Sequence, residues 1–183
     1  NFTLGVGLAW HKGRLYASYA YNKGTENTPT EEAHARVSED GGKTWGPPVV
    51  MDAGDGDLAV SHGVFLSHGG KLWAFMGAFY AHTRLYHRVH ARGYLLNETA
   101  GAWEPQGAVV KLDKGRDDDQ NGAAVLVSQG AKTEVNLFIK PLPGVAQPAH
   151  IHEGACPVPG AVKYPLTNIA EGKSKTVVDV ALA

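Results

Sequence analysis

The stretch Ser38-Glu39-Asp40-Gly41-Gly42-Lys43-Thr44-Trp45 has the residue pattern of a tight turn between two β-strands. A carboxylate at Asp40 can accept hydrogen bonds from backbone N–H groups, and the glycines tolerate the positive φ that such turns need. An aromatic ring at the end of the turn can pack against the sheet that the turn joins. We therefore expect one structural turn built by Ser38, Asp40, Gly42, Thr44 and Trp45.

The sequence around this turn is repeated. The segment His11-Lys12-Gly13-Arg14-Leu15-Tyr16-Ala17 recurs 57 residues later as His68-Gly69-Gly70-Lys71-Leu72-Trp73-Ala74. A second pair of segments, Trp45-Gly46-Pro47 and Trp103-Glu104-Pro105, is 58 residues apart. Two landmarks with nearly the same period indicate two copies of one structural unit.

Short alternating segments bounded by turn residues predict β-strands through this repeat. No segment shows a sustained helical period, and 23 glycines among 183 residues favour strands and turns over long helices. We therefore expect an all-β fold. The strands expected in this part of the chain are 5–10, 14–21, 63–66, 71–80 and 84–95.

The turn at Asp40 resembles the Asp-box of the sialidase and BNR-repeat superfamily, and the resemblance covers about residues 5–110. The stretches Asn22–Thr28 and Val60–Phe65 are similar to bacterial sialidase-like proteins in particular. The resemblance implies two blades of a sialidase-like β-propeller in residues 1–110. It also implies that the Asp-box is a folding element on the blade rim, away from any catalytic centre. The second copy, near Asn97–Trp103, lacks the aspartate.

The resemblance also implies what a sialidase active site requires: an arginine cluster, a Tyr–Glu nucleophile pair and an acid/base Asp, enclosed by a full ring of blades. Arginine suits this role because its fork binds a carboxylate in bidentate fashion. No arginine triad can be assigned in this sequence. The candidate catalytic residues, chosen by residue type alone, are Glu31, Glu32, His62 and Arg84, and a structural role stays open for each. We expect no hydrolysis by an isolated chain.

Aromatic residues are the candidates for sugar binding, because their rings can stack on sugar rings. The three that we select are Trp73, Tyr80 and Tyr86, and the alternative for each is a place in the core. The expected ligand is a glycan.

A charged stretch at 111–122, KLDKGRDDDQNG, predicts a linker or loop. Its run Asp117-Asp118-Asp119 could ligate calcium, but an exposed acidic turn is the simpler interpretation. Residues 123–183 then form a second part, with expected strands at 123–128, 133–140 and 176–182. This part resembles the CHRD family, named for chordin, which implies a small antiparallel β-sandwich-like segment.

The motif His150-Ile151-His152 is similar to the copper-binding His-x-His of Cu/Zn superoxide dismutase. In a strand, residues i and i+2 point to one side, so His150 and His152 could hold copper or zinc together. Glu153 or Cys156 could add a third ligand. No histidine follows His152, so we expect no dismutase activity, and a purely structural His pair stays open.

Composition narrows the choice of partners. The net charge of −1 leaves no basic surplus to neutralise phosphates, so nucleic acid is not expected. No apolar run is long enough to span a membrane. The sequons Asn1-Phe2-Thr3 and Asn97-Glu98-Thr99 are compatible with a secreted or periplasmic location.

These observations predict an extracellular glycan-associated binding or structural module of sialidase-like descent that is not catalytic as an isolated chain. One alternative is a sialidase-like glycoside hydrolase completed by oligomerisation, in which three two-blade chains close a ring as a trimer. The other is a metal-binding or matrix-assembly module that uses the His-x-His motif.

Overall fold

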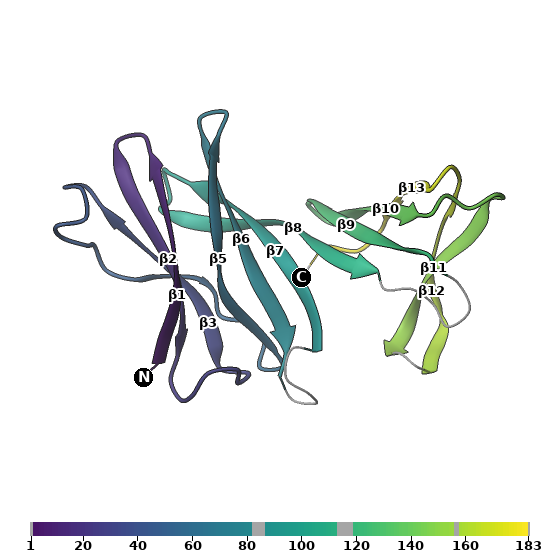
Figure 1. Cartoon of the computed structure of the whole chain (residues 1–183), viewed down its shortest axis with the longest axis horizontal. Helices are drawn as coiled ribbons and strands as arrows, with labels where there is room; N and C mark the ends of the chain where they lie inside the picture. The colour runs from purple at the N-terminus through teal and green to yellow at the C-terminus, as the bar shows by residue number, and fades with distance from the viewer. Residues whose placement is uncertain (1, 82–86, 113–118, 156–157, 183) are drawn as a thin grey trace. The chain divides into compact units, whose positions relative to one another are not determined.

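The structure is a computed structural model that describes residues 2–81, 87–112, 119–155 and 158–182. All regular elements longer than a single bridge in these residues are β-strands, and neighbouring strands pair antiparallel, so the expected all-β class is confirmed. The chain divides into two compact units, unit 1 at Asn1–Gln106 and unit 2 at Gly107–Ala183. In Figure 1 unit 1 runs from purple to teal and unit 2 from green to yellow.

The first sheet of unit 1, called sheet 1, has four strands that follow one another in chain order. A two-residue turn joins the first two strands, longer connections join the others, and a bulge lies in the first strand between Leu4 and Gly7. The Asp40 turn connects the last two strands. The strands are β1 Phe2–His11, β2 Arg14–Asn22, β3 Glu31–Ser38 and β4 Val49–Asp52.

The next four strands, here called sheet 2, also follow one another in chain order, and they form part of a seven-stranded sheet that continues into later strands. Their bounds are β5 Leu58–His68, β6 Lys71–Tyr80, β7 His87–Asn97 and β8 Ala102–Leu112. His11 ends β1 and His68 ends β5, so the sequence repeat coincides with the first hairpin of each sheet. The strand expected at 63–66 is longer, and the expected residues 84–86 lie outside the described part of the chain.

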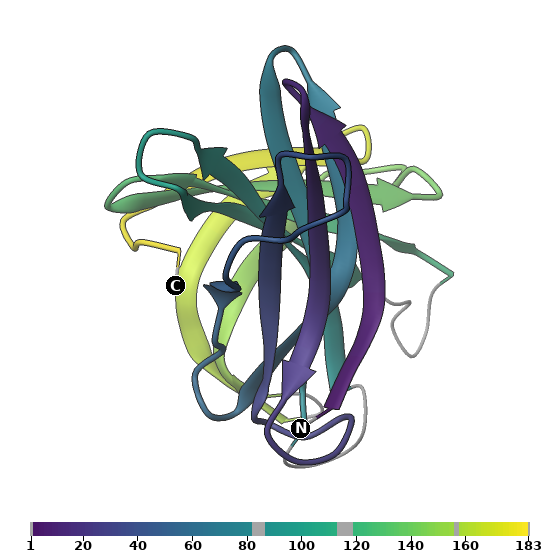
Figure 2. The same ribbon diagram turned by 90° about the vertical axis from the view of Figure 1, so that its left-hand side faces the viewer.

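Sheets 1 and 2 pack against each other through one face each, and Figure 2 shows the strands of sheet 1 in front of β5 and β6. Small residues let the sheets approach closely: a Cβ added at Gly7 would lie 2.5 Å from the Gly63 carbonyl oxygen. The buried residues of this core are Tyr16, Ala33, Ala35, Met51, Leu58, Val60, Leu72, Ala74, Met76, Ala78, Tyr94 and Trp103.

Unit 2 contains the end of β8, the remaining strands of the same seven-stranded sheet and a separate hairpin. The last residues of β8 pair with β9 Asn121–Gln129, followed in the sheet by β10 Lys132–Lys140 and β13 Lys173–Val178. The hairpin joins β11 Gln147–Ala155 to β12 Val158–Ile169. The buried core of unit 2 consists of Val135, Leu137, Ala149, Ile169 and Val178.

One strand boundary in unit 2 was wrong. The expected strand 176–182 begins earlier, at Lys173, and ends at Val178. Its first residues extend the strand because Phe138 of β10 pairs with Lys173. In the described residues the sheets are open and none closes on itself.

Candidate functional site

The Asp40 turn is held together by its own polar groups. Thr44 donates to Asp40 through its backbone N–H (2.8 Å) and through its hydroxyl (2.6 Å). The Ser38 hydroxyl donates to Asp40 at 2.8 Å and accepts from the Gly42 N–H at 2.8 Å. Gly41 and Gly42 both have positive φ. The Thr44 hydroxyl and N–H, and then the Ser38 hydroxyl, lower the pKa of Asp40 to about 2.

Both carboxylate oxygens of Asp40 accept hydrogen bonds within the turn, and these bonds hold the turn in its conformation. The Trp45 ring is half-buried, so it packs only partly against the protein. This arrangement fits a structural element.

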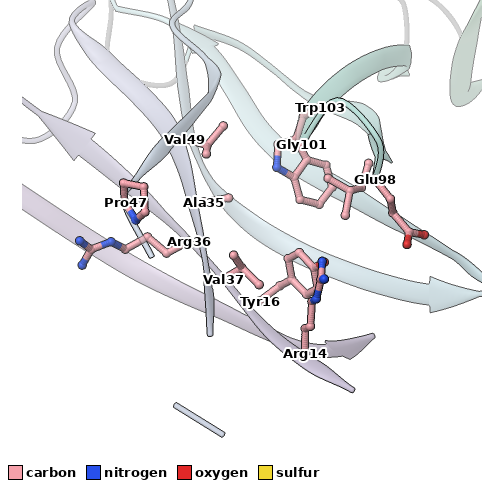
Figure 3. Close-up of a pocket in the computed structure, with 11 residues that line it drawn as sticks. Arg14, Tyr16, Ala35, Arg36, Val37, Pro47, Val49, Glu98, Gly101 and Trp103 are labelled. Carbon is pink, nitrogen blue, oxygen red and sulfur yellow. The ribbon is translucent and has the colours of Figure 1, made fainter. Parts of the chain in front are cut away.

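A cavity of about 110 Å³ lies in unit 1 between sheets 1 and 2. The buried rings of Tyr16 and Trp103 form part of its wall, with 7% and 8% of their surface exposed. Figure 3 shows the Arg14 guanidinium beside Tyr16, whereas the Arg36 guanidinium points away from the cavity. The full lining is Arg14, Tyr16, Ala35, Arg36, Val37, Pro47, Val49, Leu96, Glu98, Gly101 and Trp103.

The edge of the cavity carries one cation and one anion. A hydrogen bond with the Tyr16 side chain, and then the Glu39 carboxylate, raise the pKa of Arg14. The Arg14 Nε lies 3.4 Å from Glu39 Oε1. The Lys12 ammonium lowers the pKa of Glu98, which therefore stays ionised at neutral pH. The cavity thus combines apolar walls with charged groups that can bind hydroxyl or carboxylate oxygens.

A polar cluster next to the cavity centres on His11, which is 3% exposed. Its Nδ1 lies 2.8 Å from the Ser67 hydroxyl, and its Nε2 lies 3.4 Å from the Glu98 carboxylate. Lys12 donates to the same carboxylate oxygen at 2.5 Å. The cluster joins the β1–β2, β5–β6 and β7–β8 turns. Sequence reasoning missed it, and the only signal was the place of His11 in the repeat.

A second polar network joins the two sheets of unit 1. The buried Tyr94 hydroxyl donates to Asp52 Oδ2, and Arg92 Nε lies 2.9 Å from the same oxygen. Burial and then the hydrogen bond to Asp52 raise the pKa of Tyr94. No sequence signal pointed to this network, because its members come from β4 and β7.

The candidate catalytic residues that the structure describes do not converge. Glu31 and Glu32 are neighbours in β3, so their side chains point to opposite faces of sheet 1. Glu31 is buried and accepts from the Asn27 N–H at 3.0 Å. Glu32 Oε2 lies 2.9 Å from His34 Nε2. His62 is exposed, with Nδ1 3.0 Å from the Ser61 hydroxyl, and Arg84 lies outside the described residues.

The candidate sugar-binding aromatic residues that the structure describes lie in different environments. Trp73 pairs with Leu66 and Leu95 on the outer face of sheet 2, opposite to the face that packs on sheet 1. Tyr80 packs partly against the core of unit 1. Tyr86 lies outside the described residues. Trp73 and Tyr80, the two candidates that the structure describes, form no common aromatic surface, and Tyr16 and Trp103 are the aromatic pair that the fold places at the cavity.

His150 and His152 are exposed on β11, and their ring centroids are 5.9 Å apart. The His152 Nδ1–H donates to the Gly160 carbonyl at 2.9 Å, which leaves Nε2 as the free lone pair. Among the described residues no group of three or more His, Cys, Asp or Glu side chains could hold a metal ion. Cys156 and Asp117-Asp118 lie outside the described residues.

Comparison with known proteins adds no family to this picture. No protein-family model matches the chain, and no curated protein matches it significantly. In the described part of the chain no helix is long and apolar enough to cross a membrane. The fold and the cavity therefore define the molecule only as an all-β protein with a candidate binding site in unit 1.

Proposed function

We propose that unit 1 is a pair of sialidase-like propeller blades and that it binds glycans without hydrolysing them. The observation that carries this proposal is the cavity between sheets 1 and 2, where Tyr16 and Trp103 lie next to the charged Arg14. The consecutive order of β1–β4, which recurs in β5–β8 within the seven-stranded sheet, and the Asp40 turn support the blade interpretation.

A glycan suits this cavity because a sugar has both an apolar C–H face and polar oxygens. The C–H face can pack on the parts of the Tyr16 and Trp103 rings that line the cavity, and Trp103 also stacks on Phe65 with ring centroids 5.4 Å apart. The hydroxyl or carboxylate oxygens can accept hydrogen bonds from Arg14, whose side chain is 49% exposed. Glu98 can accept from sugar hydroxyls at the same edge.

The arrangement of Glu31, Glu32 and Glu98 supports the proposal of binding without hydrolysis. Glycoside hydrolysis commonly uses two carboxylates that flank one bond. Glu31 and Glu32 point to opposite faces of sheet 1, and one carboxylate oxygen of Glu98, Oε1, contacts both Lys12 and His11. A hydrolase completed by association of several chains remains the alternative. Turnover of a fluorogenic sialoside, lost in Glu32→Gln, would support it.

The test is calorimetric titration of the full chain with a panel of neutral and acidic oligosaccharides. We expect saturable binding that falls at least about tenfold in Arg14→Ala, which corresponds to the loss of one charged hydrogen bond. Lys71→Ala is the matched control, because Lys71 occupies the same repeat position in sheet 2 and does not line the cavity. Equal losses in both variants, or no binding, would contradict the proposal.

The His pair supports a second candidate function, weak binding of copper or zinc in unit 2. The carbonyl bonded to His152 Nδ1 orients the ring in the way that protein groups commonly orient metal-bound histidines. Titration with Cu²⁺ should show one weak site that is lost in His150→Ala. Stoichiometric metal that persists in His150→Ala would exclude this site. A secreted or periplasmic location is part of the same proposal and would suit both functions.

A further inference from the structure

Both sheets of unit 1 expose apolar residues on the face that does not pack on the other sheet. On sheet 1, Leu8 pairs with Ala17 and Trp10 pairs with Leu15, so these residues share the outer face. Leu8 and Trp10 are 59% and 58% exposed. On sheet 2, Val64 pairs with Phe75 and Leu66 with Trp73. Val64 and Leu66 are 64% and 49% exposed.

The internal repeat shows how these two outer faces are related. Tyr16 of sheet 1 and Trp73 of sheet 2 are equivalent positions, and so are Leu15 and Leu72. Within the chain, the Tyr16 face of sheet 1 packs on the Leu72 face of sheet 2. By the repeat, the Trp73 face of sheet 2 corresponds to the Tyr16 face of sheet 1, and the Leu15 face of sheet 1 corresponds to the Leu72 face of sheet 2. The Trp73 face and the Leu15 face are the two outer faces, which do not pack on the other sheet.

We propose that the chain assembles head to tail with a second copy of itself. The outer face of sheet 2 in one protomer packs on the outer face of sheet 1 in the next, and the contact continues the packing already seen between the two sheets. This inference uses the two faces and the repeat, and it does not depend on glycan binding.

The apolar character of the two faces supplies the driving force, because each exposed valine, leucine or tryptophan that becomes buried is removed from water. Two different faces meet, so the contact is heterologous, and it closes into a ring or grows into a filament according to its rotation. A ring of three protomers would contain six sheets.

The experiment uses two variants that each disable one face of the full chain. Trp10→Glu places a charge on the outer face of sheet 1, and Leu66→Glu does the same on sheet 2. Both side chains are exposed, so neither substitution should unfold the protein, and thermal melting checks this. Val145→Glu, at a 76% exposed valine of unit 2, is the matched control. Mass is measured by light scattering after size exclusion.

We expect the wild type and Val145→Glu to form oligomers and each face variant alone to be a monomer. An equimolar mixture of Trp10→Glu and Leu66→Glu should form a 1:1 dimer that grows no further, because each variant keeps the face that the other lacks. A monomeric wild type would overturn the proposal. A monomeric mixture, or self-association of either face variant alone, would overturn it as well.

Discussion

The Ser67 hydroxyl lies 2.8 Å from Nδ1 of the buried His11, and this hydrogen bond joins turns that are 56 residues apart in the sequence. It connects the end of β1 with the end of β5, which are equivalent strands of the repeat. Hydrogen bonds between these turns fix how the first hairpins of the two sheets meet. The cavity lies beside this junction, and Glu98 belongs to both.

Ser67→Ala should destabilise the protein by about 1–3 kcal/mol, because it leaves a nitrogen of the buried His11 ring without its partner. Urea unfolding followed by tryptophan fluorescence measures the change. His68→Ala is the control, because His68 is the exposed repeat counterpart of His11, and its effect should stay within about 0.5 kcal/mol. Equal effects of the two substitutions would show that the buried cluster has no special role.

Gly7→Ala should destabilise unit 1 by about 1–3 kcal/mol, because the new methyl group would lie 2.5 Å from the Gly63 carbonyl oxygen. The two sheets would have to move apart. Gly77→Ala is the matched control within sheet 2, since its nearest atom would be at an ordinary contact distance of 3.6 Å. Thermal unfolding of both variants tests the prediction, and a Gly7→Ala protein as stable as Gly77→Ala would disprove the close packing.

We predict that ionisation of Tyr94 lowers the stability of the protein at alkaline pH. Burial raises its folded-state pKa above the ordinary value of about 10, so the neutral phenol favours the folded state. This contribution is fully present below pH about 10 and is lost as the pH rises toward the folded-state pKa. Urea unfolding of the wild type should therefore show falling stability above pH about 10. Tyr94→Phe should be less stable at neutral pH but should show a shallower alkaline decline.

We predict that protonation of Asp40 lowers the stability of the protein at acidic pH. Its folded-state pKa of about 2 lies below the ordinary value, so its contribution is present above pH about 4 and is lost as the pH falls toward 2. Asp40→Ala should lower the melting temperature at neutral pH and should flatten the acid decline over this range. Glu39→Ala, in the same turn, is the control. An acid profile of Asp40→Ala that matches the wild type would rule out this role for the carboxylate.

The sequence predicted the elements that depend on local signals. Alternation and turn glycines located β1, β2, β6, β9 and β10 to within a few residues, and the Asp40 turn has the polar contacts that its residue types suggest. It did not predict β11 and β12 as a hairpin, because Pro148, Pro159 and Pro165 interrupt their pattern.

The cavity and the polar networks depend on contacts between distant segments, which no local pattern reports. Tyr16 and Trp103 belong to β2 and β8, and Asp52 and Tyr94 belong to β4 and β7. By residue type the sequence favoured Trp73 and Tyr80 for binding, whereas the fold puts the aromatic pair Tyr16 and Trp103 at the cavity. The glycan itself is a prediction that only binding experiments can test.

The most direct test of glycan binding at the cavity is the NMR signal of the Trp103 indole N–H during titration with an oligosaccharide that binds. Assignment by Trp103→Phe identifies the signal among the four tryptophans of the chain. We expect a saturable shift of this signal, with the affinity measured by calorimetry, and a much smaller shift for Trp73 on the outer face. A glycan that binds while the Trp103 signal stays unchanged would contradict binding at the cavity.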